Sequence, residues 1–292
     1  MKISKNKPIR ILLWIAFFTS PVSLAAVGER NVMVIPQVVV GVSESLCYES
    51  LVIVSNPGVI STEVAVFSYG STGGVIFPSV TLQLAPMETR TIRVQDAAGL
   101  RVGWVWLSSV NVFTAAVHIL SRPCANVQEA PTQVSILAQP RVSKAVIPVF
   151  RRLSALESGI PENTGIAIAN GQGADLDCRL VLRNAAGTIV AEKTVAIAFL
   201  RQVAKYVTEF FPELPANFAS GSLTIEYPDI PYSFAVTALY TDGSRMWSAP
   251  VANLDTPNVY FIKLKSSSSI GQIGNELASQ YGLYLFTGLP PR

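Results

Sequence analysis

The residues that could do acid–base, nucleophilic or metal chemistry are few in this chain and far apart. His118, in the stretch TAAVHIL, is the one histidine among 292 residues. A Ser-His-Asp triad around it would need an activated serine, and no G-x-S-x-G turn is present. A zinc site would need several histidines or cysteines at ligand spacing. We therefore predict a structural role for His118, and no catalytic residue, metal site or bound cofactor.

Asp175 and Asp177 form the D-x-D pair that most resembles the start of a calcium loop. The glycine and the terminal glutamate of such a loop are missing, and Leu176 and Cys178 interleave with the acids as strand residues. A glycosidase pair is not tested by spacing, because its two carboxylates can lie far apart in sequence. Glycine-rich phosphate loops and dinucleotide fingerprints are absent. The sequence therefore predicts a protein that is not an enzyme.

Three cysteines bear on the disulfide content of the chain. An odd number leaves at least one thiol free or paired with another chain. Cys178 shares a strand face with Leu176 and Leu180, and we predict that it is a buried, small hydrophobic residue. Cys47 and Cys124 flank the first half of the mature chain and are the candidate intrachain disulfide. The alternative is that both stay reduced, because spacing does not give the separation of their Cα atoms.

Trp104 and Trp106 are the candidates for contact with a partner. They share one face of the stretch GWVWLSS, and Phe113 follows in the next run. Aromatic rings in this arrangement either pack in a core or form a platform on which a carbohydrate stacks. Both interpretations stay open, and the second makes the two tryptophans surface-contact residues.

The first 25 residues are typical of a secretory signal peptide. Four basic residues precede a short apolar run at Ile11–Phe18, Pro21 follows, and Ser23-Leu24-Ala25 offers small residues for cleavage. The run is too short to span a bilayer as an anchor, although an uncleaved anchor is the alternative. We predict a secreted, periplasmic or cell-surface bacterial protein with no membrane span after cleavage.

Removal of residues 1–25 changes the charge of the protein. The whole chain has 22 Lys+Arg and 19 Asp+Glu, and the leader holds four basic and no acidic residues. The remainder therefore carries 18 basic and 19 acidic residues, a net charge of about −1. No basic stripe is left to bind phosphates, which excludes nucleic acid as a partner.

Short runs of β-branched and aromatic residues, most of them alternating with polar residues, follow one another through the chain. Asn-Pro-Gly, Gly-Gly or Pro separates these runs, with no helices between them, and a short helical or irregular crossing precedes the last hairpin of each repeated unit. Half of the residues are hydrophobic and 14% are charged, so a sizeable core can form. This pattern predicts an all-β protein with antiparallel sheets in a sandwich or barrel.

The second half of the chain repeats the order of runs in the first half. Ser50–Gly74 matches Gly165–Thr188, and Gly103–Leu120 matches Gly221–Tyr240. In this match the polar segment that starts at Asn170 takes the place of the one that starts at Ser55, and the two differ in every side chain. Both are rich in turn formers, so we interpret them as bends and not as binding loops. The predicted parts are a signal peptide at 1–25, sandwiches at 26–143 and 144–256, and a tail at 257–292.

A family resemblance covers about 90 residues of the second unit. TGIAIAN, then RQVAKYVTEFFPELPANF and GSL, resembles a module of bacterial exported proteins with the pattern G-(I/L)-A-(I/V)-A-N, G-Q-x-A-x-(F/Y)-(V/L)-x-E-x-F-P and F-x-G-S-L. Arg201 stands where the module usually has glycine. The resemblance implies an immunoglobulin-like sandwich of unassigned, non-enzymatic function. We interpret Phe210, Phe211, Leu214 and Phe218 as an apolar plug between sheets, with an aromatic ligand box as the alternative.

The last 36 residues have a β-α-β pattern. Asn258–Lys265 is predicted as a strand, Ile270–Gly282 as a helix, and Leu283–Phe286 as a second short strand. The run is similar to the start of the inhibitor-like propeptide of subtilisin-family proteases, and it stops before the second half of that domain. The alternative is a short α+β tail that packs on the second sandwich.

Together these observations predict an exported, non-catalytic structural or binding protein: a spacer, an adhesin-like module or a surface-interaction module. Its expected partner is a protein or a glycan at the cell surface. Two alternatives stay open. One is an ancillary or truncated N-terminal region of an exported subtilisin-like protease. The other is a periplasmic chaperone-like protein that offers a strand edge, for which Arg151 and Arg152 are candidate anchors of a client's carboxylate.

Overall fold

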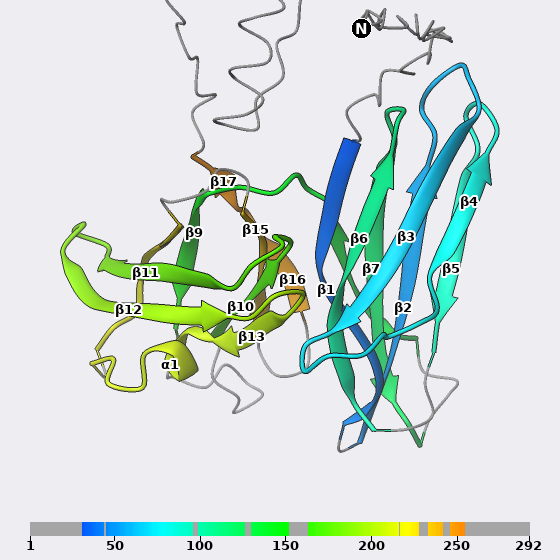
Figure 1. Cartoon of the computed structure of the whole chain (residues 1–292). Helices are drawn as coiled ribbons and strands as arrows, with labels where there is room; N and C mark the ends of the chain where they lie inside the picture. The colour runs from blue at the N-terminus through cyan, green and yellow to red at the C-terminus, as the bar shows by residue number, and fades with distance from the viewer. Residues whose placement is uncertain are drawn as a thin grey trace, which may run out of the picture.

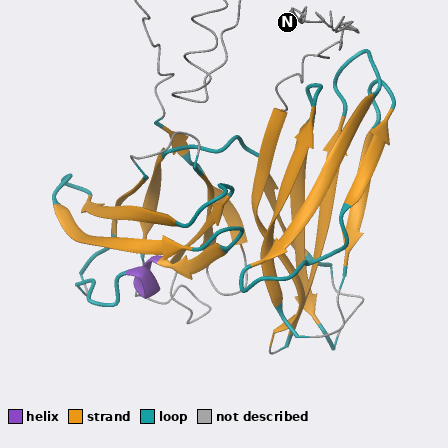
Figure 2. Ribbon diagram, in the orientation of Figure 1, coloured by secondary structure: helices purple, strands orange, loops and turns teal. Residues whose placement is uncertain are grey.

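The computed structural model describes residues 31–254, apart from 44, 96–98, 126–129, 152–162, 216, 228–232 and 242–245. Within these residues the chain forms strands with a single short helix, and all of the named strand pairs are antiparallel. The prediction of an all-β fold is therefore confirmed (Figures 1 and 2). The signal peptide and the β-α-β tail lie outside the described residues.

The first sandwich is built from eight strands. Its first layer has the order β4-β3-β6-β1, and its second layer has the order β5-β2-β7-β8. The strands are β1 (Asn31–Ser43), β2 (Leu46–Ser55), β3 (Thr62–Gly70), β4 (Val80–Leu84), β5 (Thr89–Val94), β6 (Arg101–Ser109), β7 (Thr114–Pro123) and β8 (Thr132–Leu137).

Strand β1 belongs to both layers of the first sandwich. It pairs with β6 up to Val40, and Gly41 to Ser43 then pair with β2. Gly41 has φ 98°, a left-handed conformation that favours glycine, and it lies where the strand changes partner. The register of β1 also shifts between Ile35 and Val38, which marks a β-bulge at Pro36 and Gln37.

The second sandwich repeats the strand order of the first. Its layers are β13-β10-β15-β16 and β12-β11-β14-β9, with β17 added beside β9. Adding eight to each strand number of the first sandwich gives these two orders, so the predicted internal repeat extends to the topology. The elements are β9 (Lys144–Phe150), β10 (Asn163–Asn170), β11 (Leu176–Asn184), β12 (Ile189–Ile197), β13 (Gln202–Tyr206), α1 (Val207–Phe210), β14 (Ser220–Glu226), β15 (Phe234–Thr241), β16 (Met246–Ala249) and β17 (Ala252–Asn253).

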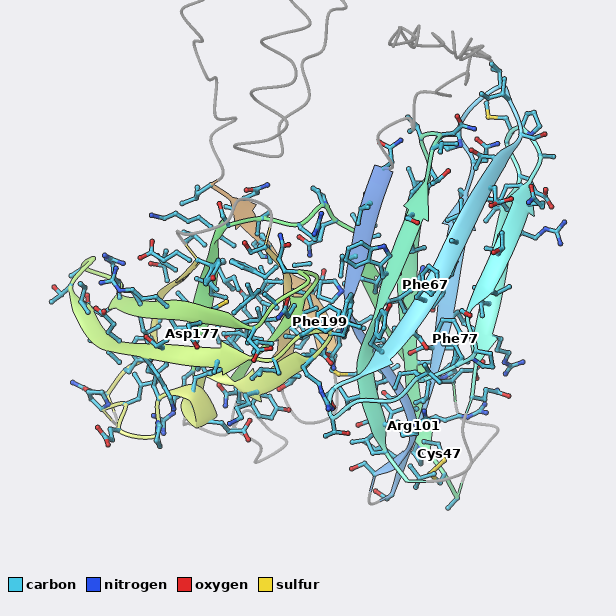
Figure 3. The ribbon with its side chains drawn as sticks, in the orientation of Figure 1. Cys47, Phe67, Phe77, Arg101, Asp177 and Phe199 are labelled. Atoms are coloured by element: carbon cyan, nitrogen blue, oxygen red, sulfur yellow. A yellow bond between two sulfur atoms is a disulfide. The ribbon has the colours of Figure 1, made fainter. Side chains whose placement is uncertain are left out.

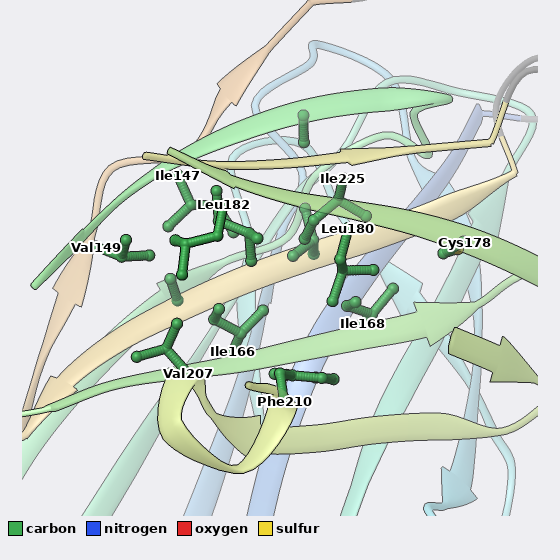
Figure 4. Close-up of a cluster of buried hydrophobic side chains, with 14 of the residues drawn as sticks. Ile147, Val149, Ile166, Ile168, Cys178, Leu180, Leu182, Val207, Phe210 and Ile225 are labelled. Carbon is green, nitrogen blue, oxygen red and sulfur yellow. The ribbon is translucent and has the colours of Figure 1, made fainter. Parts of the chain in front are cut away.

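Each sandwich encloses its own apolar core. Alternation along the strands directs every second side chain inward, as the burial pattern of β3 (Thr62–Gly70) shows. In the second sandwich Ile166 and Ile168 from one layer face Leu180 and Leu182 from the other (Figure 4). The predicted apolar plug is part of this core, because Phe210, Phe211, Leu214 and Phe218 are all buried.

Asn56 and Asn170 hold equivalent turns in the two sandwiches. The Asn56 amide donates to the carbonyls of Ile60, Leu84 and Ala85, and its Oδ1 accepts from the N–H of Gly58. Asn170 makes the same four kinds of bond, to the carbonyls of Ala174, Ile197 and Ala198 and from the N–H of Gln172.

These bonds confirm that the polar segment after Asn170 is a bend. They also correct the sequence match, which was one residue out of register and paired Asn170 with Ser55. The two turns therefore share their most important side chain. The bend needs it because a buried carbonyl without a partner is costly.

Two further features are duplicated. The Ser50 hydroxyl accepts from the N–H of Val39 and donates to its carbonyl, and Thr164 does the same with Phe150. Each buried hydroxyl therefore links the strand that opens its sandwich to the opposite layer.

The turn before the fifth strand of each sandwich is also the same. Met87 and Leu200 lie there with φ 59° and 56°, values that are uncommon for residues other than glycine. Both turns therefore hold a strained residue at the same place, and the backbone repeats in detail where the side chains differ.

Candidate functional site

The residues that the sequence singled out for chemistry lie apart from one another. The His118 ring is on the outer face of β7, with Nδ1 2.9 Å from Nε2 of Gln133. Asp175 Oδ1 accepts from the N–H of Phe199 at 2.8 Å, and Asp177 is exposed on β11 (Figure 3). Among the described residues no group of three or more His, Cys, Asp and Glu side chains could hold a metal ion.

The disulfide candidates come together in the structure. Cys47 and Cys124 form a bridge with Cα atoms 5.0 Å apart, and Cys47 lies at the end of the first sandwich where β1 turns into β2 (Figure 3). Cys178 is free and buried in the core of the second sandwich. Burial, and then the charge of Asp177, raise the pKa of the Cys178 thiol to about 12, so it is not a reactive nucleophile.

Trp104 does not lie on the surface, which makes the surface-contact interpretation wrong for this residue. Its ring is fully buried between the two sandwiches, stacked on Tyr69 with centroids 4.7 Å apart. The residues packed around it include Val34 from the first sandwich and Ala169 and Ala235 from the second. The outer face of the first layer is therefore covered by the second sandwich at this point.

Trp106 lies beside Trp104 and is partly buried. The Arg141 guanidinium lies over the Trp106 ring, 5.1 Å from its centre, and donates at 2.9 Å to the carbonyl of Gly171. Burial lowers the pKa of Arg141 from its usual value, but that value is so high that the group stays charged. Trp106 thus forms part of the contact between the sandwiches and is not a free platform.

The segment between β8 and β9 is fixed to both sandwiches. Gln139 exchanges backbone hydrogen bonds with Val34, and its side chain donates to the carbonyl of Val236 at 2.5 Å. Val142 donates to the carbonyl of Phe234 at 2.6 Å. A connection held at these points fixes the angle between the sandwiches, in contrast to an ordinary flexible linker.

A cleft of about 560 Å³ lies between the sandwiches beside this contact, a volume in the usual range of ligand sites. Its floor is the outer face of the layer β13-β10-β15-β16, where Gly165 and Ala167 leave room. Its opposite wall comes from β1, β2, β6, β7 and the residues after β3. The apolar residues that line it are Val39, Leu100, Val102, Ile119, Ile166, Val203, Leu239 and Met246, of which Ile166 and Val203 direct their side chains to the core of the second sandwich.

Two glutamines form the polar part of the cleft. Gln202 at the start of β13 donates through Nε2 to the carbonyl of Pro36 at 2.5 Å and to Oε1 of Gln37 at 2.7 Å. Both partners belong to the β-bulge of β1. Gln202 is 4% exposed, and its own Oε1 is buried without a hydrogen-bond partner. An unpaired buried acceptor in a cleft wall suits a ligand that brings a donor.

The ionisable groups of the cleft are at its rim. Lys205 and Tyr206 are exposed on β13, and Glu209 follows on α1, where its Oε2 accepts from the N–H of Tyr206 at 2.7 Å. None of the groups that line the cleft forms a nucleophile–base pair within the described residues. The arrangement can bind a ligand through apolar contact and hydrogen bonds.

Sequence reasoning missed Gln37 and Gln202 as site residues. Pro36-Gln37 interrupts the apolar run VMVIPQVVV, and such an interruption is the signature of a bulge. The motif of the second unit predicted only a fold. Six of its residues nevertheless line the cleft: Gly165, Ala167, Gln202, Ala204, Tyr206 and Glu209.

Arg151, one of the two candidate anchors for a client's carboxylate, does not line this cleft. It follows β9, where its backbone N–H donates to the carbonyl of Ala219 at 2.8 Å. Arg152 lies outside the described residues. In the part of the chain that the structure describes, no helix has the length and apolar character to cross a membrane.

Comparisons with known proteins add little. No protein-family model and no curated protein matches the chain. A search of solved structures finds a chain described as an anti-sigma factor domain-containing protein, at 8% identity and a TM-score of 0.17, over 76% of this chain and 82% of the other. A TM-score of this size carries no argument about fold or function.

Proposed function

We propose that this chain is an exported, non-catalytic binding protein in which two immunoglobulin-like sandwiches are held at a fixed angle and a ligand occupies the cleft between them. The observation that carries the proposal is the cleft itself, which is apolar over most of its lining and has the hydrogen-bonded Gln37–Gln202 pair in its wall. The expected partner is a protein or a glycan at a cell surface.

The proposal is supported by how the cleft is maintained. The Arg141 side chain contacts both sandwiches, and Gln139 joins them through backbone bonds to Val34 and a side-chain bond to Val236. A cleft whose walls are already fixed loses less conformational freedom when it is filled, and pre-organisation of this kind raises affinity. A protein that served only as a spacer would need the fixed angle between the sandwiches. It would not need the exposed apolar surface of the cleft.

Dye binding tests whether the cleft is an accessible apolar site. The probe is 1-anilinonaphthalene-8-sulfonate, whose fluorescence rises in apolar surroundings. We expect saturable binding to the protein and at least about a tenfold weaker signal in Ala204→Trp, where a large ring fills the mouth of the cleft. Thr91→Trp is the matched control, because Thr91 is exposed on β5, the equivalent strand of the first sandwich. Equal dye binding by the protein and Ala204→Trp would refute the cleft as the site.

Export needs its own measurement. Cells that express the full chain are fractionated, and the N-terminus of the protein is determined by mass spectrometry. We expect a product that has lost residues 1–25, outside the cytoplasm. A full-length product in the cytoplasm would contradict the exported part of the proposal and leave the dye experiment unaffected.

A further inference from the structure

Among the described residues, one edge of the layer that forms the cleft floor has no neighbour. β13 is the outermost strand of the order β13-β10-β15-β16, and within the described residues it pairs only with β10. Ala204, Lys205 and Tyr206 are exposed along it. An open strand edge is a template on which another extended segment can pair.

The register shows which backbone groups of β13 are available. Asn170 donates to the carbonyl of Arg201, and antiparallel pairing alternates from there, so Val203 and Lys205 direct their N–H and C=O groups toward β10. Gln202 and Ala204 direct theirs toward the open edge. The N–H of Tyr206 is already bound by Glu209. The free edge is therefore short and centred on Ala204.

The side chains at this edge face the cleft. Gln202, Ala204 and Tyr206 lie on the same face of β13, and all three line the cleft together with Ser71 and Thr72 of the first sandwich. A segment paired with β13 would present every second side chain to the cleft. It would also bring N–H donors close to Gln202, whose buried Oε1 lacks one.

The equivalent edge of the first sandwich carries more charged side chains than the edge at the cleft. β5 carries Arg90 and Arg93, whose side chains are 58% and 62% exposed and pair with Glu88 and Glu49. Charged side chains on an outer strand discourage pairing with another chain. β13 has a single charged residue, Lys205, on the face opposite Ala204. Two strands with the same place in a duplicated fold thus differ in the feature that blocks strand addition.

We propose that the cleft binds an extended polypeptide segment, which adds to β13 as a further strand and places alternate apolar side chains in the cleft. This inference rests on the proposed function and names its ligand class. The free N–H and C=O groups of Gln202 and Ala204 favour a polypeptide, because an acyl chain or another purely apolar molecule would leave them without partners.

Peptide selection tests the proposal. Short random peptides displayed on phage are selected on the purified protein, and the enriched sequences are made as labelled synthetic peptides for fluorescence anisotropy. We expect enrichment of sequences with apolar residues at every second position. Ala204→Pro removes one outward N–H and hinders pairing without removing a bond to β10, and it should weaken peptide binding by about tenfold or more. Thr91→Pro on β5 is the matched control and should bind as the unchanged protein does.

A second measurement is independent of how well Ala204→Pro folds. Hydrogen exchange of the unchanged protein should show slower exchange of the Ala204 amide when a selected peptide is bound. Peptides methylated at the amide nitrogens of one edge should lose binding, and those methylated at the other edge should keep it.

The outcomes separate this inference from the proposed function. If the dye binds the cleft but no peptide is enriched, or if Ala204→Pro binds peptides unchanged, strand addition is refuted and the cleft stands as a site for an apolar small molecule. If the protein dimerises in analytical ultracentrifugation and Ala204→Pro does not, the edge belongs to a second copy, which also refutes a separate segment. If neither the dye binds the cleft nor any peptide is enriched, the proposed function itself is refuted.

Discussion

The guanidinium group of Arg141 lies over Trp106 of the first sandwich and donates to the carbonyl of Gly171 of the second. One side chain of the connecting segment therefore contacts both sandwiches. A Cβ atom at Gly171 would come within 2.8 Å of Arg141 and 3.1 Å of Trp106, so the turn that carries the bend also fits closely into this contact.

Replacement of Arg141 should loosen the contact between the sandwiches. We expect Arg141→Ala to lower the free energy of unfolding by about 1–2 kcal/mol, because a partly buried cation–π contact and a hydrogen bond are lost together. Urea denaturation followed by tryptophan fluorescence measures the change. Arg90→Ala, which removes a more exposed ion pair with Glu88, is the control and should change stability by less than about 0.5 kcal/mol. Equal effects of the two variants would speak against a joining role for Arg141.

Asn170 should be more important for stability than its place in a surface turn suggests. Asn170→Ala leaves the carbonyls of Ile197 and Ala198 without their donor, and we expect a loss of about 2–3 kcal/mol. Asn184→Ala is the matched control, since the Asn184 side chain also binds backbone groups of a turn, accepting from the N–H groups of Ala186 and Thr188, but it is not buried. It should lose less than about 1 kcal/mol. Chemical denaturation of both variants decides the matter, and similar losses would contradict the assigned role.

Reduction of the Cys47–Cys124 bridge should destabilise the first sandwich. The bridge closes a loop with a sequence separation of 77, for which chain entropy gives a stabilisation of about 4 kcal/mol. We expect a lower melting temperature in reducing buffer, measured by calorimetry. The double substitution of Cys47 and Cys124 by serine should melt at the same temperature in both buffers. If the unchanged protein melts at the same temperature with and without reductant, the bridge is not formed.

The Cys178 thiol should resist modification in the folded protein. Burial raises its pKa to about 12, so almost no thiolate is present at neutral pH and no reagent reaches it. We expect dithionitrobenzoate to label one thiol in denaturant and none in native buffer. Rapid labelling under native conditions would mean that the core of the second sandwich opens often.

Glu226 should make a small, pH-dependent contribution to stability. Burial disfavours its charge, but hydrogen bonds from Lys144 and Arg179 outweigh this and lower its pKa from the ordinary value of 4.5. A carboxylate with a lowered folded-state pKa stabilises above its unfolded pKa and loses this effect as the pH falls through the folded pKa. Between pH 7 and pH 3, the free energy of unfolding should therefore fall less in Glu226→Gln than in the unchanged protein. Parallel pH profiles would exclude the effect.

The strand pattern was predictable because each layer of a sandwich has one face in a core. This makes apolar and polar side chains alternate along its strands. The contact between the sandwiches was harder to predict. From the sequence, Trp104 was either a core residue or a surface residue of one sheet. Alternation along a strand shows that two faces differ, but it does not show which domain covers the outer face. The clearest signal is in β10, where Gly165, Ala167 and Ala169 alternate with core isoleucines, because small residues on an outer face leave room for another domain.

The cleft was less predictable than the fold. Gln202 was visible as part of a motif, but its partners Pro36 and Gln37 lie more than 160 positions earlier in the chain. Only the bulge of β1 and the fixed connection bring them together. Pairings across such distances follow from how two folded units meet, which local sequence does not encode.

The described chain enters at the start of β1 and leaves at β17 on the same side of the molecule, while β13 lies toward the opposite side (Figure 1). Because the connecting segment holds the two sandwiches at one angle, an attachment at the start of β1 or at β17 would leave β13 on the side away from it. Geometry alone would then determine which way the protein faces its surroundings.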